Sequence, residues 1–130
     1  MKCWEKVSGE EYEGSSMNQI DWQKDFPGSI TVADKDGIII YMNNRALKTF
    51  ENYGGKNLIE TNVLDCHPEP AKSKLKELME NQSTNVYSIE KNGIKKMIYQ
   101  APWYKDNEYA GIVELSVEIP FEIPHFVRSN

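Results

Sequence analysis

The last third of the sequence alternates between apolar and polar residues, and this alternation constrains the fold more than any other feature. The first alternating segment, 85–91, runs into Asn92-Gly93, a dipeptide typical of two-residue β-hairpin turns. Segments 94–103 and 109–119 alternate in the same way, with a polar turn between them. Because successive side chains of a strand point to opposite faces of a sheet, these segments predict a three-stranded antiparallel meander.

The same alternation predicts which strand residues face the interior. In the last segment the residues from Val113 onward are apolar at every second position, with acidic residues and serine between them. We therefore expect one dry face and one wet, acidic face. In the segment before it, Met97, Tyr99 and Trp103 share one face, and we expect this face to lie under the helices.

An earlier strand pair and two helices precede the meander. Segments 29–33 and 38–42 are rich in strand-forming residues and flank the turn residues 34–37, which predicts a hairpin. Asn44 is placed to cap a short helix, and segment 70–81 has the apolar spacing of an amphipathic helix. The order hairpin, helices, meander predicts an α+β fold in which short helices cover one face of an antiparallel sheet.

The length of 130 residues is that of a single domain. Residues 1–25 are expected to form a polar N-terminal extension with a short helix, capped by Asn18 or Asp21. Residues 26–119 are expected to form the domain, and residues 120–130 a tail rich in proline and aromatic residues. The side chains that the short helix is expected to place against the body are Ile20 and Trp22.

Charge and hydropathy exclude several classes of function. Fifteen basic and twenty acidic side chains give a formal net charge of −5, and the longest basic run alternates Lys72, Lys74 and Lys76. A nucleic-acid surface needs a basic stripe, so we expect no nucleic-acid partner. No apolar run approaches the roughly 18 residues of a membrane span, so we expect a cytoplasmic protein without a membrane partner. Cys3 and Cys66 are expected to stay reduced.

Three features, in the order in which they occur, resemble the PAS sensor family. The strand-turn-strand segment 29–43 closes on an asparagine, with Ala46 shortly after it. The segment 67–69, His-Pro-Glu, is similar to the signature that begins the long PAS helix. The closing three-stranded meander is the third feature.

The resemblance implies a PAS-like five-stranded antiparallel sheet of spatial order 2-1-5-4-3, with short helices arched over one face to enclose a small cavity. Members of the family bind haem, flavin or small metabolites there, or bind nothing and serve as dimerisation and relay modules. The fold alone does not determine which of these functions a member has. The residues that line the cavity determine it.

A set of large apolar or polar residues is expected to line this cavity and bind a ligand. Methionines, a tyrosine hydroxyl and an indole N–H can form an adaptable pocket with a few polar contacts. Packing in the core is the alternative for most of them, and capping or bridging of strands is the alternative for the asparagine. The expected ligand-binding residues are Met42, Asn43, Phe50, Leu64, His67, Met97, Tyr99 and Trp103.

His67 is the residue with the most chemistry open to it. A neutral imidazole can bind iron or act as a general base, but a helix-entry residue that bonds nearby backbone is the favoured interpretation. Haem-binding relatives usually take their histidine from a helix beside the cavity, and segment 70–81 contains none. The flavin-linked light sensors carry a Gly-x-Asn-Cys motif, and Val63 stands at the position of that cysteine. Haem and flavin thus stay open as cofactors without being favoured.

The sequence therefore predicts a non-enzymatic PAS sensory module that binds a small molecule and signals in trans to a downstream protein. No nucleophile motif or phosphate loop is present, so no catalytic residue and no metal site are expected. The first alternative is a ligand-free scaffold that homodimerises through the amino-terminal helix and the tail. The second is a haem or redox sensor that uses His67.

The tail is expected to dock on a protein surface. Its large apolar side chains would each gain roughly 1.5 to 3 kcal/mol from burial. We expect them to lie on the open sheet face of the same domain or on another subunit. These residues are Phe121, Ile123, Phe126 and Val127.

Overall fold

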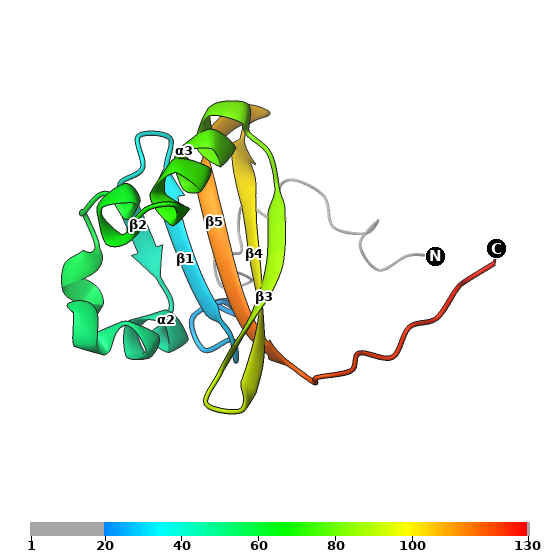
Figure 1. The fold of residues 1–130 in the computed structure, drawn as a ribbon. Helices are drawn as coiled ribbons and strands as arrows, with labels where there is room; N and C mark the ends of the chain where they lie inside the picture. The colour runs from blue at the N-terminus through cyan, green and yellow to red at the C-terminus, as the bar shows by residue number, and fades with distance from the viewer. Residues whose placement is uncertain (1–19, 130) are drawn as a thin grey trace.

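The computed structural model describes residues 20–129. It contains a five-stranded antiparallel sheet in the order β2-β1-β5-β4-β3, with helices on one side (Figure 1). The predicted α+β class, the hairpin, the meander and the strand order are confirmed. The strands are β1 (Ser29–Asp34), β2 (Ile39–Met42), β3 (Asn85–Lys91), β4 (Ile94–Lys105) and β5 (Glu108–Ile119).

The chain between β2 and β3 supplies the helices. Figure 1 shows α3 crossing one end of the sheet and α2 lying at the other end, with three short 3-10 helices between them. None of the helices within residues 20–129 is long and apolar enough to span a membrane. The helices are α2 (Asn44–Thr49), η3 (Glu51–Tyr53), η4 (Gly55–Leu58), η5 (Val63–Cys66) and α3 (Ala71–Asn81).

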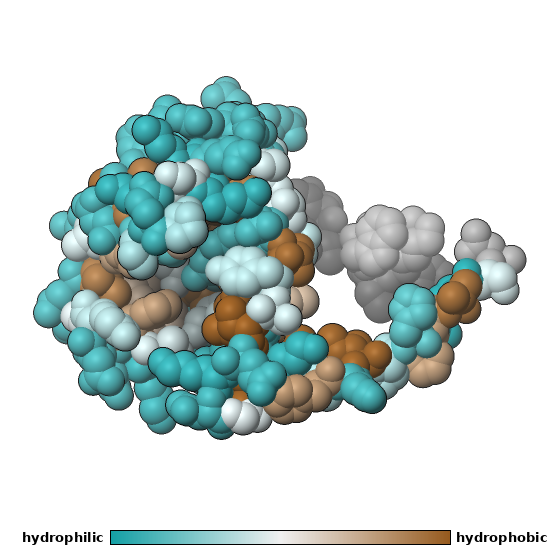
Figure 2. All heavy atoms as spheres, in the orientation of Figure 1, coloured by the Kyte–Doolittle hydropathy of each residue, from teal (hydrophilic) through white to brown (hydrophobic). Residues whose placement is uncertain are grey.

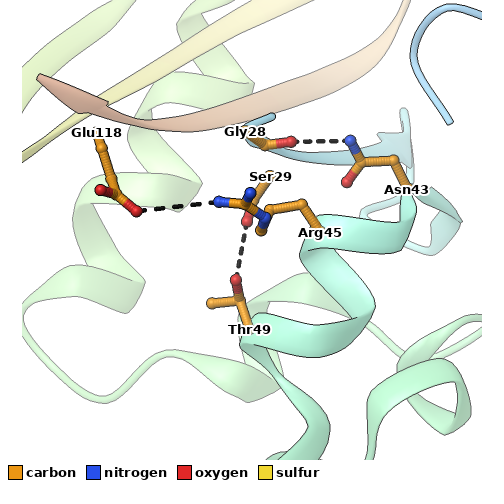
Figure 3. A network of polar contacts seen from close by, with 6 residues as sticks. All are labelled: Gly28, Ser29, Asn43, Arg45, Thr49 and Glu118. Carbon is orange, nitrogen blue, oxygen red and sulfur yellow. Dashed lines mark hydrogen bonds and ion pairs between the residues drawn. The ribbon is translucent and has the colours of Figure 1, made fainter. Parts of the chain in front are cut away.

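A buried asparagine after β2 joins the hairpin to α2. Asn43 is 1% exposed, and its side-chain oxygen accepts hydrogen bonds from the backbone N–H groups of Ile30 and Ala46, both at 2.9 Å. Its side-chain amide donates to the carbonyl oxygens of Gln23 at 2.9 Å and Gly28 at 2.8 Å (Figure 3). One side chain therefore holds the start of β1, the start of α2 and the segment before β1 together.

The helix cap is one residue earlier than the sequence predicts. Asn43, not Asn44, caps α2, because its side chain accepts the hydrogen bond from Ala46. The side chain of Asn44 instead donates to Asp25 at the surface, at 2.7 Å.

Replacement of Asn43 by alanine is expected to destabilise the protein by at least about 3 kcal/mol, because it leaves the buried N–H groups of Ile30 and Ala46 unpaired. Asn44→Ala is the matched control, since it removes only an exposed contact, and should change stability by no more than about 0.5 kcal/mol. Urea unfolding followed by circular dichroism measures both. Equal losses in the two variants would contradict the role given to Asn43.

The core lies between α3, α2 and one side of the sheet. Leu75 and Leu78 of α3 pack against Ala33 of β1 and Ile112 of β5. These two residues are buried and Met79 packs against them, which agrees with the apolar spacing of the predicted amphipathic helix. A second cluster lies under α2 and consists of Ile39, Met42 and Ala46.

This packing fixes which strand residues face the helices. Ala33 and Ile112 are opposite one another in the β1–β5 ladder and both lie under α3. Residues at every second position share a face, so Glu114 and Ser116 also point to the helix-facing side. Gln100 of β4 pairs with Glu114 and lies on the same side.

The residues of the predicted dry face lie on the opposite side of the sheet, here called the outer face. Met97, Tyr99 and Trp103 alternate with Gln100 and its neighbours and pair with apolar residues or glycine of β5. The prediction that they lie under the helices is wrong. A two-residue period shows which side chains share a face, but not which face the helices cover. The apolar part of the outer face on β3, β4 and β5 consists of Val86, Met97, Tyr99, Ala101, Trp103, Val113, Leu115 and Val117.

A glycine in β5 brings the neighbouring strands close together at one end of the outer face. Trp103 pairs with Gly111, and its indole N–H donates across β5 to the carbonyl oxygen of Ala33 at 2.9 Å. Gly111 has a φ of +147°, and a Cβ atom there would overlap that same carbonyl group. This approach requires glycine at position 111.

Replacement of Gly111 by alanine is expected to cost at least about 3 kcal/mol of stability, because the new methyl group forces β1 away from β5. Gly93→Ala is the control. Gly93 also has a positive φ but nothing lies near its would-be Cβ, so the cost should be about 1 kcal/mol. Thermal unfolding of both variants tests this, and a loss at Gly111 no larger than that at Gly93 would show that the close approach is unimportant.

The segment before β1 lies against the outer face next to β5. Gly28 lies between the ring of Phe26 and Val117. Residues 22–25 form turns rather than a helix, and Ile20 and Trp22 are exposed, so their predicted packing on the body is wrong. The proposed cap Asn18 lies outside the described residues.

Candidate functional site

Polar side chains form a row across the helix-facing side of the sheet. The side-chain amide of Asn85 on β3 donates to the side-chain oxygen of Gln100 on β4 at 3.1 Å. The amide of Gln100 in turn donates to a carboxylate oxygen of Glu114 on β5 at 2.7 Å. Gln100 is 4% exposed, whereas Asn85 and Glu114 are half-buried, so the row leads from the rim of the sheet into the interior.

A small cavity lies between this row and α3. Its volume is about 20 Å³, which is enough for one water molecule. Thr31, Gln100 and Glu114 line it on the sheet side, and its wall is mostly apolar. The full lining consists of Thr31, Ala33, Val63, Leu75, Gln100, Ile112 and Glu114.

Glu114 gives the site its charge. One carboxylate oxygen accepts from Gln100, and no lysine or arginine among residues 20–129 forms an ion pair with this carboxylate. Burial raises the pKa of the Tyr87 hydroxyl on β3 above its usual value, and the charge of Glu114 raises it further. The site can therefore accept hydrogen bonds or a positive charge, and it disfavours a second negative charge.

Replacement of Glu114 by glutamine is expected to lower the pKa of Tyr87, because the repelling charge is removed. The pKa should stay above its usual value, since burial is the larger cause. A pH titration of ¹³C-labelled tyrosine rings by NMR measures the change. Glu90→Gln on the other side of β3 is the control and should leave the pKa of Tyr87 unchanged. If the pKa of Tyr87 is also unchanged in the Glu114 variant, the charge of Glu114 does not act on the Tyr87 hydroxyl.

Polar contacts also join α2 to the far end of this side. The hydroxyl groups of Ser29 and Thr49 lie 3.1 Å apart, and Arg45 lies 3.9 Å from Glu118 (Figure 3). Both members of the ion pair are about half exposed, so the pair contributes little to stability. It does place one positive and one negative group at the rim.

Three of the predicted site residues lie in the interior. Met42 is buried in the cluster under α2, and Phe50 packs against that cluster. Leu64 packs against the cluster under α3. Asn43 is also buried, but all four of its hydrogen-bonding positions are occupied by backbone groups. Asn43 thus caps the helix and bridges strands, which was the alternative to ligand binding, and its side chain has no free hydrogen-bonding group for a ligand.

His67 lies at the end of η5, where its surroundings fit the helix-entry interpretation. Its ring Nδ1 lies 2.8 Å from the carbonyl oxygen of Val63. Glu69 accepts hydrogen bonds from the hydroxyl and the backbone N–H of Ser73, which hold the pKa of Glu69 below its usual value. The His-Pro-Glu segment therefore organises the entry into α3.

The other three predicted site residues are not brought to this site. Met97, Tyr99 and Trp103 lie on the outer face, on the opposite side of the sheet. The residues that replace them were missed because polar strand residues were assigned to solvent. A signal was present: a two-residue turn at Asn92-Gly93 fixes the register of the hairpin, and this register pairs Asn85 with Gln100. Paired amides on neighbouring strands indicate a shared hydrogen bond.

Within residues 20–129 no group of three or more His, Cys, Asp and Glu side chains is arranged to hold a metal ion. The chemistry that this site offers is hydrogen bonding and charge. Its residues are held by strands, which makes their positions rigid.

Comparisons with solved structures identify the fold. The PAS domain of an HTR-like protein from Haloarcula marismortui matches with a TM-score of 0.58 and 13% identity, over 85% of this chain and 96% of that one. The PAS domain of the histidine kinase ThkA matches with a TM-score of 0.55 and 20% identity, over 69% and 98%. The Aer2 receptor from Vibrio cholerae, described as a dual PAS-haem oxygen sensor, matches with a TM-score of 0.53 and 20% identity, over 72% and 95%.

The sequence alone gives no such match. No protein-family model matches the chain, and no curated protein sequence matches it either. The chain has the fold of a PAS domain, as the motifs and the strand order predict.

Proposed function

We propose that this chain is a non-enzymatic sensory or signal-transduction module of the PAS type that acts through protein–protein contact. The PAS domains that it resembles include parts of a histidine kinase and a receptor. The observation that carries the proposal is the polarity of the sheet. Apolar side chains form the outer face, away from the helices, while Asn85, Gln100 and Glu114 point inward.

This distribution favours a covered outer face. An antiparallel sheet with one side in water normally turns its polar residues to that side. Here Val86 and Tyr99 are exposed, and their apolar neighbours on β4 and β5 are half-buried. Contiguous apolar surface of this kind is typical of a protein contact.

The small volume of the cavity favours a function in protein–protein contact over the binding of a small-molecule ligand. Small-molecule pockets have volumes of roughly 300 Å³ or more, whereas the cavity beside Glu114 has about 20 Å³. Haem and flavin are far larger than this space. The ligand-free scaffold thus has more support than the small-molecule sensor, and His67 as an iron ligand has the least.

Binding of a small molecule stays a second proposal because of one observation, the carboxylate of Glu114 beside the cavity without an ion-pair partner among residues 20–129. A ligand would carry hydrogen-bond donors or a positive charge and would widen the space under α3. Met42, Phe50 and Leu64 would then contact it from the interior clusters. In both proposals the module signals in trans to a downstream protein and acts in the cytoplasm.

Native mass spectrometry of the purified full chain tests the two proposals. Contact through the outer face predicts an oligomer whose mass is that of its chains alone. A small molecule that copurifies in a one-to-one ratio, and is reduced in Glu114→Gln, would favour the second proposal. A monomer without any bound molecule at micromolar concentration would count against the first. An absorption spectrum of the same sample detects haem or flavin directly.

A further inference from the structure

Residues 120–129, here called the tail, carry large apolar side chains into solvent. The tail leaves the end of β5 and extends away from the sheet (Figure 1). In Figure 2 its brown residues stand clear of the body. Four apolar residues are between 52% and 88% exposed, which is costly for side chains of this size. They are Phe121, Ile123, Phe126 and Val127.

The path of the tail directs it away from its own outer face. Pro120 and Pro124 lack an N–H group and keep the backbone extended, so the tail neither folds into a helix nor continues β5 as a regular strand. The ammonium group of Lys95 donates to the carbonyl oxygen of Phe121 at 3.2 Å and holds the start of the tail at the end of the sheet. The four apolar side chains therefore stay more than half exposed, although Arg128 lies over the ring of Phe126.

The same chain carries a surface of matching chemistry. The apolar part of the outer face leaves Val86 and Tyr99 exposed, and the charged pair Glu90 and Lys95 lies beyond it on the same side, next to the turn between β3 and β4. The tail has only two charged residues, Glu122 and Arg128. The segment before β1 lies against the outer face only around Val117, so an extended apolar segment from a second copy has a surface of matching chemistry on the rest of it.

We propose that the chain forms a two-fold dimer in which the tail of each copy docks on the outer face of the other copy. This inference rests on the proposed function, because it names the partner that covers the outer face. The exchange is reciprocal, so two identical contacts close the dimer and leave no free tail or face.

The area of such an exchange fits a stable dimer. Burial of the exposed parts of the four apolar side chains removes on the order of 400 Å² per tail. With both tails and the matching area on both sheets, the total is about 1,600 Å², the typical size of a specific interface.

The first nineteen residues are a poorer occupant of this face. Six of them are charged, namely Lys2, Glu5, Lys6, Glu10, Glu11 and Glu13. Burial of such residues on an uncharged surface costs free energy, because charges lose water without gaining a partner. The apolar tail does not carry this cost.

Complementation between two variants of the full chain tests the exchange. Phe121→Asp with Phe126→Asp removes the tail contact, and Tyr99→Glu removes the face contact; each should raise the dimer Kd by about 30-fold or more. When the two variants are mixed, the intact tail of one chain meets the intact face of the other at one of the two contacts, so the mixture should dimerise more tightly than either variant alone and less tightly than the wild type. Light scattering coupled to size-exclusion chromatography measures the mass, and circular dichroism verifies that each variant is folded.

Matched variants keep the result interpretable. Tyr53→Asp changes an exposed aromatic residue of η3 on the helix side and should leave the dimer intact. If Tyr99→Glu does not fold, Val86→Glu at the exposed edge strand replaces it.

Three outcomes would overturn the inference. A dimer that survives the tail substitutions uses other surfaces, which leaves the proposed function standing without the exchange. A mixture that dimerises no more tightly than either variant alone contradicts the pairing of one chain's tail with the other chain's face. A wild-type chain that is monomeric at all concentrations contradicts both the tail exchange and the proposed function on which it rests.

Discussion

The contact of Leu75 and Leu78 with Ala33 and Ile112 decides the character of the whole molecule. Once these four side chains are packed, every other position of β1 and β5 is assigned to one side of the sheet. Glu114, two residues beyond Ile112, must then point inward. Val113, which lies between them, must point outward, and so must Leu115 and Val117, which share its face. The polar interior and the apolar exterior are thus two results of one packing contact.

Much of the architecture could be predicted because its signals are local. Asn92-Gly93 marks a hairpin, the spacing of α3 marks its buried side, and the His-Pro-Glu segment marks the entry into that helix. The order of these elements along the chain leaves few arrangements of an antiparallel sheet. The family resemblance narrowed them to one, and the observed order β2-β1-β5-β4-β3 agrees with it.

The site was harder to predict because it depends on contacts between distant segments. Met42, Phe50 and Leu64, which were expected to line the cavity, are buried in the core clusters or packed against them, because they lie on short elements directly beside the core. Met97, Tyr99 and Trp103 were misplaced by the assumption that the apolar side of a strand meets the helices. Only the contact between α3 and the small residue Ala33, 42 positions before Leu75 in sequence, reveals which side is covered.

The amide of Asn43 also holds the segment before β1, in addition to its part in the helix cap. It donates a hydrogen bond to the carbonyl oxygen of Gln23, and the backbone N–H of Asn44 donates to the carbonyl oxygen of Lys24 at 3.0 Å. The segment before β1 is therefore tied by hydrogen bonds to the junction between β2 and α2. Displacement of this segment would leave the buried amide of Asn43 without one of its acceptors, so the order of residues 23–24 and the stability of the junction depend on each other.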